Sequence, residues 1–118
     1  MIVGTGIDLV ELERIESALA RQERFYERVL TTKEQELFLR LPKHRQIEFL
    51  AGRFAAKEAF SKALGTGIGK EISFQDIEVL PNQLNKPVIQ SKKFKGNIHL
   101  SISHSRNYAI AQIVLKAD

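Results

Sequence analysis

The chain has no cysteine among its 118 residues. A disulfide, a thiolate metal site and a cysteine nucleophile are therefore excluded. No apolar run approaches the roughly 20 residues that span a bilayer. The first residues also lack the basic and apolar segments of a secretory signal peptide. These absences together predict a protein of the reducing cytoplasm.

No internal repeat, low-complexity tract or linker interrupts the sequence, so we expect residues 1–118 to form one domain with its own core. An apolar fraction of 43% and a charged fraction of 27% are ordinary for a globular protein. The formal net charge of +4 favours acidic partners, such as nucleic acid, phosphorylated cofactors or acidic proteins.

The longest regular stretch is a predicted helix that begins near residue 45 and ends at Gly65, where glycine suits a left-handed cap. Glu58 and Lys62 are four residues apart and share one face. This pair is consistent with an ordinary exposed ion pair or with a site for an anionic, metal-bound ligand. A neighbouring stripe carries Arg53, Lys57 and Ser61.

Residues 1–9 read as a strand in which Gly4 and Gly6 indicate close approach of another group. Asp8 ends this strand, and with Glu11 it matches a helix capping box. A metal would give Asp8 a second role, because two carboxylates on different elements, completed by water and phosphate oxygens, describe a typical Mg²⁺ site. In such a metal site, Glu58 would be the second carboxylate.

A helix follows, with its apolar residues at inward spacing. Its opposite side carries three basic residues, either as a plain solvated face or as a dock for an acidic helix. They are Arg14, Arg21 and Arg24.

The remaining pattern predicts a short helix that starts in a capping box at Thr31 or Thr32 and is stopped by Pro42. Four strands follow. The order of a strand, helices and then a run of strands predicts an α+β fold, with an antiparallel sheet packed against a long central helix and shorter helices. The expected strands are residues 74–80, 86–90, 98–103 and 108–115.

Two local motifs carry little chemistry alone. Residues 65–69 are glycine-rich but close a helix, whereas a P-loop opens one. Ser101 and Ser103 precede His104 without the strand-to-helix elbow of a nucleophilic serine. His104, at a turn, could donate a hydrogen bond to a phosphate or to the backbone.

Three blocks in order resemble the holo-[acyl-carrier-protein] synthase family, the short bacterial 4′-phosphopantetheinyl transferases. They are Gly6-Ile-Asp-Leu-Val-Glu11, Arg53-Phe-Ala-Ala-Lys-Glu-Ala-Phe-Ser-Lys-Ala-Leu-Gly-Thr-Gly67, and Ser101-Ile-Ser-His104 with Tyr108-Ala109. The family usually has Gly-Lys-Pro where this chain has Asn85-Lys-Pro87, a mild departure because asparagine tolerates the left-handed conformation.

The resemblance implies the transferase fold, with Asp8 and Glu58 holding Mg²⁺ against the coenzyme A pyrophosphate. Lys62 would act beside them in catalysis. Around the coenzyme, the family's binding positions correspond to Ser61, Lys62, Gly65, Pro87 and His104.

The resemblance also implies a reaction. A serine of apo-acyl carrier protein attacks coenzyme A, phosphopantetheine is transferred for fatty acid biosynthesis, and adenosine 3′,5′-bisphosphate leaves. The general base stays open, the candidates being Glu58 or Asp8 through a metal-bound water. Arg14, Arg21 and Arg24 would receive the acidic helix of the carrier protein, and the family is a homotrimer with active sites at subunit interfaces.

Two rival functions are also compatible with the sequence. One is a small basic nucleic-acid-binding module, favoured by Lys92-Lys-Phe-Lys95, which mixes positive charge with an aromatic ring. The other is a carrier-protein-binding module that has lost catalysis, against which the intact Asp8 and Glu58 argue.

Overall fold

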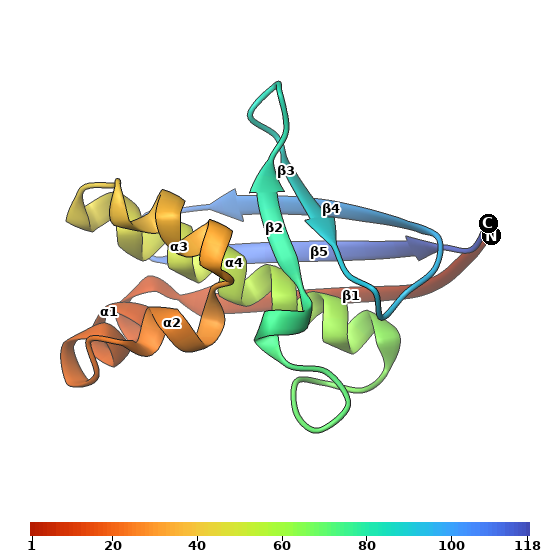
Figure 1. Cartoon of the computed structure of the whole chain (residues 1–118), viewed down its shortest axis with the longest axis horizontal. Helices are drawn as coiled ribbons and strands as arrows, with labels where there is room; N and C mark the ends of the chain where they lie inside the picture. The colour runs from red at the N-terminus through yellow and green to blue at the C-terminus, as the bar shows by residue number, and fades with distance from the viewer.

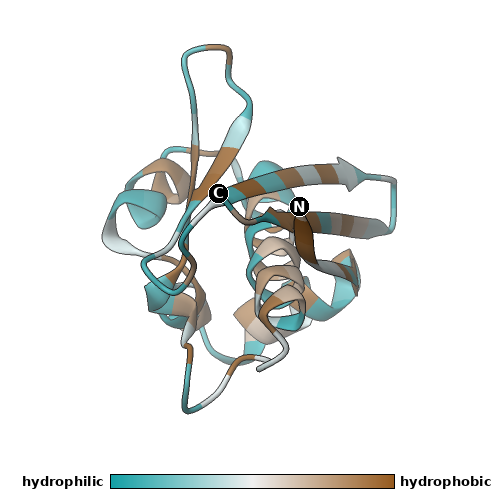
Figure 2. Cartoon of the chain, turned by 90° about the vertical axis from the view of Figure 1, so that its right-hand side faces the viewer, coloured by the Kyte–Doolittle hydropathy of each residue, from teal (hydrophilic) through white to brown (hydrophobic).

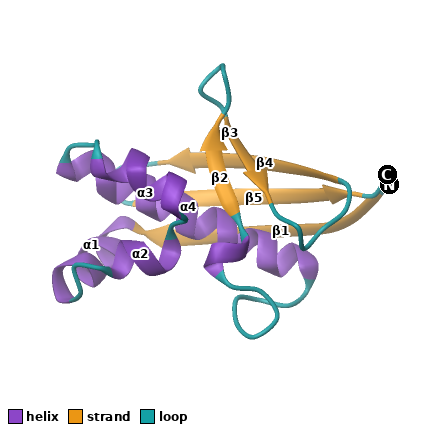
Figure 3. Ribbon diagram, in the orientation of Figure 1, coloured by secondary structure: helices purple, strands orange, loops and turns teal.

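The computed structural model describes residues 1–118 and has the predicted α+β architecture (Figures 1 and 3). Strand β1 comes first, four helices follow, and the remaining strands complete the chain. The elements are β1 (Ile2–Glu11), α1 (Leu12–Arg21), α2 (Phe25–Val29), α3 (Thr32–Leu39), α4 (Lys43–Leu64), the 3₁₀ turn η1 (Phe74–Asp76), β2 (Glu78–Pro81), β3 (Pro87–Gln90), β4 (Asn97–His104) and β5 (Tyr108–Lys116).

The strands form two separate antiparallel units. Three strands make a sheet in the order β1-β5-β4, so the last strand of the chain is central and β1 and β4 are the two edges. Strands β2 and β3 pair only with each other, as a hairpin that projects from the body (Figure 1). The expected strand 74–80 is shorter than predicted, because residues 74–76 form the 3₁₀ turn.

Helix α4 lies against one face of the three-stranded sheet at unusually short range. A Cβ atom on Gly6 would overlap the carbonyl oxygen of Ala59, and one on Gly4 would overlap that of Ala63. The prediction that these glycines mark a close approach is therefore confirmed. Alanines on the helix and glycines on the strand together allow the two backbones to meet.

The hydrophobic core lies between α4 and this sheet. Ala109, Ala111, Ile113 and Leu115 alternate inward along β5 and are buried, as expected for a sheet with one covered face. The strands accordingly alternate between hydrophobic and hydrophilic residues (Figure 2). The opposite face has no covering layer within the chain, and its exposed apolar residues include Ile7, Leu9, Tyr108 and Ile110.

The predicted capping box at Asp8 is wrong. Strand β1 continues to Glu11, which pairs with Tyr108, and Asp8 pairs with Ala111 inside the ladder. Glu11 is the N-cap residue of α1 and its side chain makes no capping bond. Pairing with β5, which is distant in sequence, therefore prevails over the local capping pattern.

The other helix boundaries follow the sequence more closely. The capping box at Thr31 is confirmed, with the Thr31 amide donating to Glu34 Oε1 at 2.7 Å. Gly65 ends α4 with φ of 85°, the left-handed conformation that was predicted. Helix α4 begins two residues early, at Lys43, because Pro42 serves as its N-cap instead of only ending the helix before it. None of the helices combines the length and apolar character needed to cross a membrane.

Candidate active site in two separate parts

The first cluster of predicted site residues lies where the C-terminal half of α4 passes β1. Lys62 Nζ donates to Asp8 Oδ1 at 2.9 Å and to the carbonyl oxygen of Ile7 at 3.3 Å. The cation of α4 thus pairs with the neighbouring strand, and the simple Glu58–Lys62 ion pair within the helix does not form. Asp8 reaches this position because it is on the helix-facing side of β1, in register with the two glycines.

Glu58 lies beside this ion pair. Burial raises the pKa of the Glu58 carboxyl, the charge of Asp8 raises it further, and Lys62 opposes both effects. Two carboxylates from different elements therefore face one ammonium, which leaves an excess of negative charge. No third Asp, Glu or His side chain joins the cluster. An oxygen-only pair of carboxylates with room for water and phosphate ligands fits Mg²⁺.

Ser61 and Gly65 lie next to this cluster along α4. The Ser61 side chain is fully buried, and its hydroxyl donates to the carbonyl oxygen of Glu58 at 2.7 Å. Gly65 faces open space, because no atom lies within 4 Å of the position that a Cβ atom would take there. The helix end near Lys62 is therefore accessible, whereas the Ser61 hydroxyl already has a partner within the helix.

The second cluster surrounds a cleft of about 700 Å³ beside the N-terminal half of α4. Pro87 and His104, both predicted to bind the coenzyme, line this cleft together. Sequence reasoning did not predict the arginines that join them, Arg40, Arg45 and Arg53. Three guanidinium groups outnumber the one carboxylate of the lining, that of Glu48, which lies 3.6 Å from Arg45 Nε. The cleft is therefore positive overall, which suits a phosphorylated ligand.

Arg53 has the most unusual environment of the three arginines. Its Cζ atom lies 3.8 Å from the ring centroid of Phe49, and its Nε atom is buried without a hydrogen-bond partner. Burial lowers the pKa of Arg53 to about 10, against an opposing effect from Glu34. The spacing of Phe49 and Arg53, one helical turn apart, was the signal that could have identified this pair.

His104 is held against the same part of α4. Its Nε2 atom lies 3.2 Å from the carbonyl oxygen of Glu48. Gly52 makes room for the ring, because a Cβ atom there would come within 3.3 Å of His104 Nε2. A small residue on α4 therefore determines how closely β4 and its histidine approach the helix.

The two clusters lie on opposite edges of the three-stranded sheet (Figure 1). Asp8 is on β1 and His104 is on β4, with β5 between them. Neighbouring strands are about 4.8 Å apart, so β1 and β4 are about 10 Å apart across the sheet. Any offset of the two clusters along the strand direction adds to this distance. One chain does not bring all of its predicted site residues into a single cleft.

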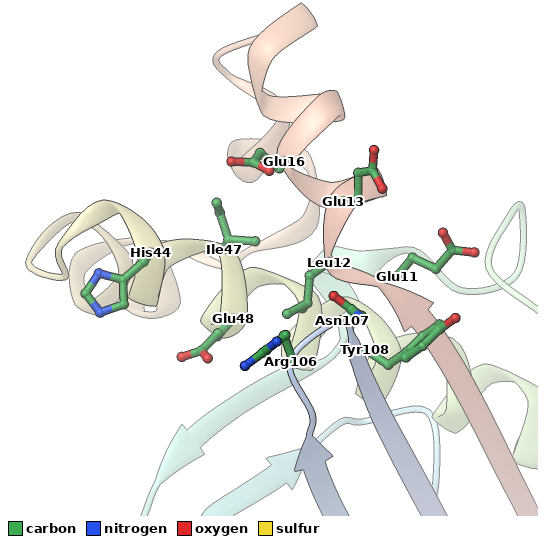
Figure 4. A pocket seen from close by; sticks show the side chains of 10 residues that line it. All are labelled: Glu11, Leu12, Glu13, Glu16, His44, Ile47, Glu48, Arg106, Asn107 and Tyr108. Atoms are coloured by element: carbon green, nitrogen blue, oxygen red, sulfur yellow. The ribbon is translucent and has the colours of Figure 1, made fainter.

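A second cleft, of about 670 Å³, opens where α1 begins (Figure 4). Four glutamates line it, opposed by only one arginine and one histidine. This acidic lining makes it unsuitable for phosphate groups. The glutamates are Glu11, Glu13, Glu16 and Glu48.

The three arginines predicted to bind a partner have different surroundings. Arg14 and Arg21 are exposed on α1, on the side away from the buried Ile15. Arg24 lies between α1 and α2 and forms an ion pair with Glu27. Arg14 and Arg21 therefore present free positive charge, whereas part of the charge of Arg24 is already neutralised.

Comparison with known proteins agrees with this architecture. The model of the 4′-phosphopantetheinyl transferase superfamily matches residues 4–113. A holo-[acyl-carrier-protein] synthase from Geobacillus kaustophilus is 60% identical over 116 residues, which cover 98% of this chain and 90% of that protein.

Solved structures show the same similarity. A holo-(acyl-carrier-protein) synthase from Bacillus anthracis in complex with CoA (3′,5′-ADP) has a TM-score of 0.94 and 52% identity, covering 100% of this chain and 99% of that one. The Helicobacter pylori holo-[acyl-carrier-protein] synthase in complex with coenzyme A has a TM-score of 0.85 and 39% identity, and the match covers 95% of this chain and 99% of that one.

The chain thus belongs to the 4′-phosphopantetheinyl transferase superfamily and, within it, to the family of holo-[acyl-carrier-protein] synthases. It is an enzyme of the phosphopantetheinyl transferase class. Family membership argues against both the nucleic-acid-binding and the non-catalytic alternatives.

Proposed function

We propose that the protein transfers 4′-phosphopantetheine from coenzyme A to a serine of apo-acyl carrier protein and releases adenosine 3′,5′-bisphosphate, for fatty acid biosynthesis. The observation that carries this proposal is the cluster of Asp8, Glu58 and Lys62, in a chain whose relatives are named holo-[acyl-carrier-protein] synthase. We place the reaction in the cytoplasm and treat residues 1–118 as one catalytic domain.

The arginine-lined cleft is the proposed site for the nucleotide end of coenzyme A. Adenosine 3′,5′-bisphosphate carries several negative charges, and Arg45 and Arg53 offer guanidinium donors to them. Arg53 forms no ion pair within the chain, so its positive charge is available to an anion in the cleft. Pro87 and His104 would hold the nucleotide from the hairpin and from β4.

Asp8 and Glu58 would hold Mg²⁺, which, when bound, neutralises charge on the pyrophosphate of coenzyme A. Lys62 would leave Asp8 for a phosphate oxygen and stabilise the charge that develops during transfer. Its side chain is about half exposed, which permits this exchange. Ser61 and Gly65 shape the end of α4 beside these phosphates.

Phosphoryl transfer requires the protein mainly to position groups and to stabilise charge. The serine hydroxyl of the carrier protein forms the new bond to the β-phosphorus, and the bond from that phosphorus to the bridging oxygen breaks. Adenosine 3′,5′-bisphosphate leaves with the bridging oxygen. The serine proton passes to one of the two carboxylates, Asp8 or Glu58. The nucleophile belongs to the substrate, which accounts for the lack of a serine elbow in this chain.

We propose that the complete site forms between copies of the chain in a homotrimer. The carboxylate cluster lies at the β1 edge and the arginine cleft at the β4 edge, so neighbouring copies could place the two together. The uncovered sheet face, with Ile7 and Leu9 more than half exposed, supplies apolar surface for such an assembly. Light scattering should give the mass of three chains, and an Ile7→Glu variant should dissociate and lose activity.

We propose that acyl carrier protein docks on α1 through Arg14 and Arg21, with Arg24 at the rim. The exposure of the first two supports this assignment, because an acidic helix needs accessible positive charge.

The test of the reaction is mass spectrometry of apo-acyl carrier protein incubated with coenzyme A, Mg²⁺ and this protein. Transfer adds one phosphopantetheine, about 340 Da, to the carrier protein. Variants Asp8→Asn and Glu58→Gln serve as matched negative controls. A carrier protein of unchanged mass with the wild-type chain would contradict the proposal.

A further inference from the structure

A buried ion pair joins α3 and α4 one helical turn from Arg53, outside the lining of both site clusters. Glu34 on α3 and Lys57 on α4 have fully buried side chains, and Lys57 Nζ lies 2.6 Å from Glu34 Oε1. Charged side chains are rarely buried completely unless they are paired. The proposed reaction gives neither residue a role, so their burial has another cause.

All three N–H donors of the Lys57 ammonium are used inside the protein. In addition to Glu34, they reach the carbonyl oxygen of Val29 at 2.7 Å and that of Phe74 at 3.1 Å. An ammonium group has three donors, so none remains for a phosphate. Lys57, although it neighbours Glu58 in sequence, is therefore a structural cation and not a ligand-binding one.

The Glu34 carboxylate links this cation to the hairpin. Its Oε1 also accepts from the Thr31 amide, and its Oε2 accepts from the amide of Val79, on β2, at 2.6 Å. Beside it, the Thr31 hydroxyl donates to Glu78 Oε2 at 2.6 Å. One buried carboxylate thus connects α3, α4 and the hairpin.

These polar links matter because the hairpin shares no ladder with the three-stranded sheet. A two-stranded hairpin is marginal on its own and takes its position from what it packs against. Its exposed tip projects from the body of the molecule (Figure 1). The orientation of the hairpin therefore depends on the packing of β3 against β4 and on the contacts at its base, where Glu34 binds Val79.

The hairpin and α4 are two walls of the arginine-lined cleft. Pro81, Asn85 and Pro87 come from the hairpin, whereas Arg45 and Arg53 come from α4. The Glu34–Lys57 pair connects these two walls below the cleft. Lys57 belongs to α4, and Glu34 bonds to the backbone of Val79 in the hairpin, so the pair is suited to set the spacing between them.

We propose that Glu34 and Lys57 are positioning residues for the nucleotide cleft: without contacting the ligand, they set the distance between the hairpin and α4 and so determine the affinity for adenosine 3′,5′-bisphosphate. This inference rests on the proposed function, because it takes the cleft to be the nucleotide site. The pair makes no hydrogen bond to the carboxylate cluster or to α1, which carries the proposed carrier-protein surface.

The test compares the wild-type chain with the double variant Glu34→Gln/Lys57→Met. Removing one charge alone leaves the other buried and unpaired and strongly destabilises the fold, whereas removing both leaves no orphaned charge. We expect calorimetry to give a dissociation constant for adenosine 3′,5′-bisphosphate about tenfold higher in the double variant. KM for coenzyme A should rise in parallel, and kcat and KM for the carrier protein should change little.

A destabilised control separates positioning from general loss of stability. Ile15→Ala creates a cavity beneath α1, far from the hairpin, and should lower stability while leaving the nucleotide dissociation constant unchanged. A folded double variant that binds the nucleotide as the wild type does would overturn the inference alone. A wild-type chain that does not bind the nucleotide would overturn both the inference and the proposed nucleotide site.

Discussion

Asp8 and His104 flank the same central strand from opposite sides. Asp8 pairs with Ala111 and His104 with Ala109, two residues apart on β5, yet their own strands are the two edges of the sheet. Helix α4 crosses beneath both, with Gly52 beside His104 and Ala59 beside the part of β1 that carries Asp8. This arrangement divides the candidate site into a carboxylate half and a nucleotide half.

The carboxylate half should be essential for transfer but not for folding. Asp8→Asn removes one proposed metal ligand without changing the size of the side chain. We expect transfer to fall by about 10² or more, as for the loss of a group that stabilises transition-state charge. Activity measured over a Mg²⁺ series, with circular dichroism as the folding control, checks this. Full activity at low Mg²⁺ would show that Asp8 is not a ligand.

Glu58→Gln should stabilise the metal-free protein while abolishing transfer. The raised pKa of Glu58 means that folding favours its neutral form, so the ionised carboxylate opposes folding at pH 7. Glutamine removes that cost, and the gain in melting temperature should be below about 4 °C for such a half-exposed group. The greater stability of the Glu58→Gln variant should diminish as the pH falls towards 4.5, the ordinary pKa of a glutamate. At that pH the Glu58 carboxyl of the folded wild type is itself largely neutral.

Thermal melts of both proteins in chelator, between pH 7 and pH 4.5, measure this difference. A variant that is less stable than the wild type at pH 7 would mean that Glu58 makes a favourable contact that its pKa does not reveal.

The exposed arginines of α1 should govern the encounter with the carrier protein. Arg14→Glu with Arg21→Glu should raise KM for the carrier protein, most strongly at low salt, and leave KM for coenzyme A unchanged. Two charge reversals at exposed positions of the loop before β4, Lys92→Glu with Lys95→Glu, are the matched control. Equal effects from both changes would point to net charge instead of a docking surface.

The close approach of β1 to α4 should make Gly6 sensitive to the smallest side chain. Gly6→Ala would press a methyl group against the carbonyl oxygen of Ala59, which must move. We expect a loss of about 1–3 kcal/mol in the free energy of unfolding, typical of overpacking. Urea titration measures it, with Gly69→Ala, at a position with open space, as the control. Equal stability of the two variants would contradict the close approach.

Local chemistry predicted the features that depend on a few neighbouring residues. Gly65 ends α4 and Thr31 caps α3 because each effect operates within one helical turn. Gly4 and Gly6 indicated a close neighbour, although not which one. Asp8 was assigned wrongly because strand pairing with β5, about a hundred residues later, decides where β1 ends.

The parts of the site that sequence reasoning missed depend on distant contacts. The sequence placed Lys57 in a polar stripe beside Glu58 and Lys62, yet Glu34, 23 residues earlier, holds it in the core. The arginine-lined cleft is formed by α3, α4, the hairpin and β4. No pattern of neighbouring residues in the sequence predicts that these four elements come together. Pro87 and His104 were found through the resemblance, and the structure shows that they share one cleft.

The central claim is that one catalytic site uses Asp8 from one copy and the arginine cleft from another. Mixing Asp8→Asn and Arg53→Gln chains, after brief denaturation and refolding together, tests it by the mass gain of the carrier protein. Each variant alone should be nearly inactive. Random mixed trimers should recover about one quarter of wild-type activity, because that fraction of interfaces combines two intact halves. No recovery in mixed assemblies of confirmed composition would contradict the claim and place the whole site within a single chain.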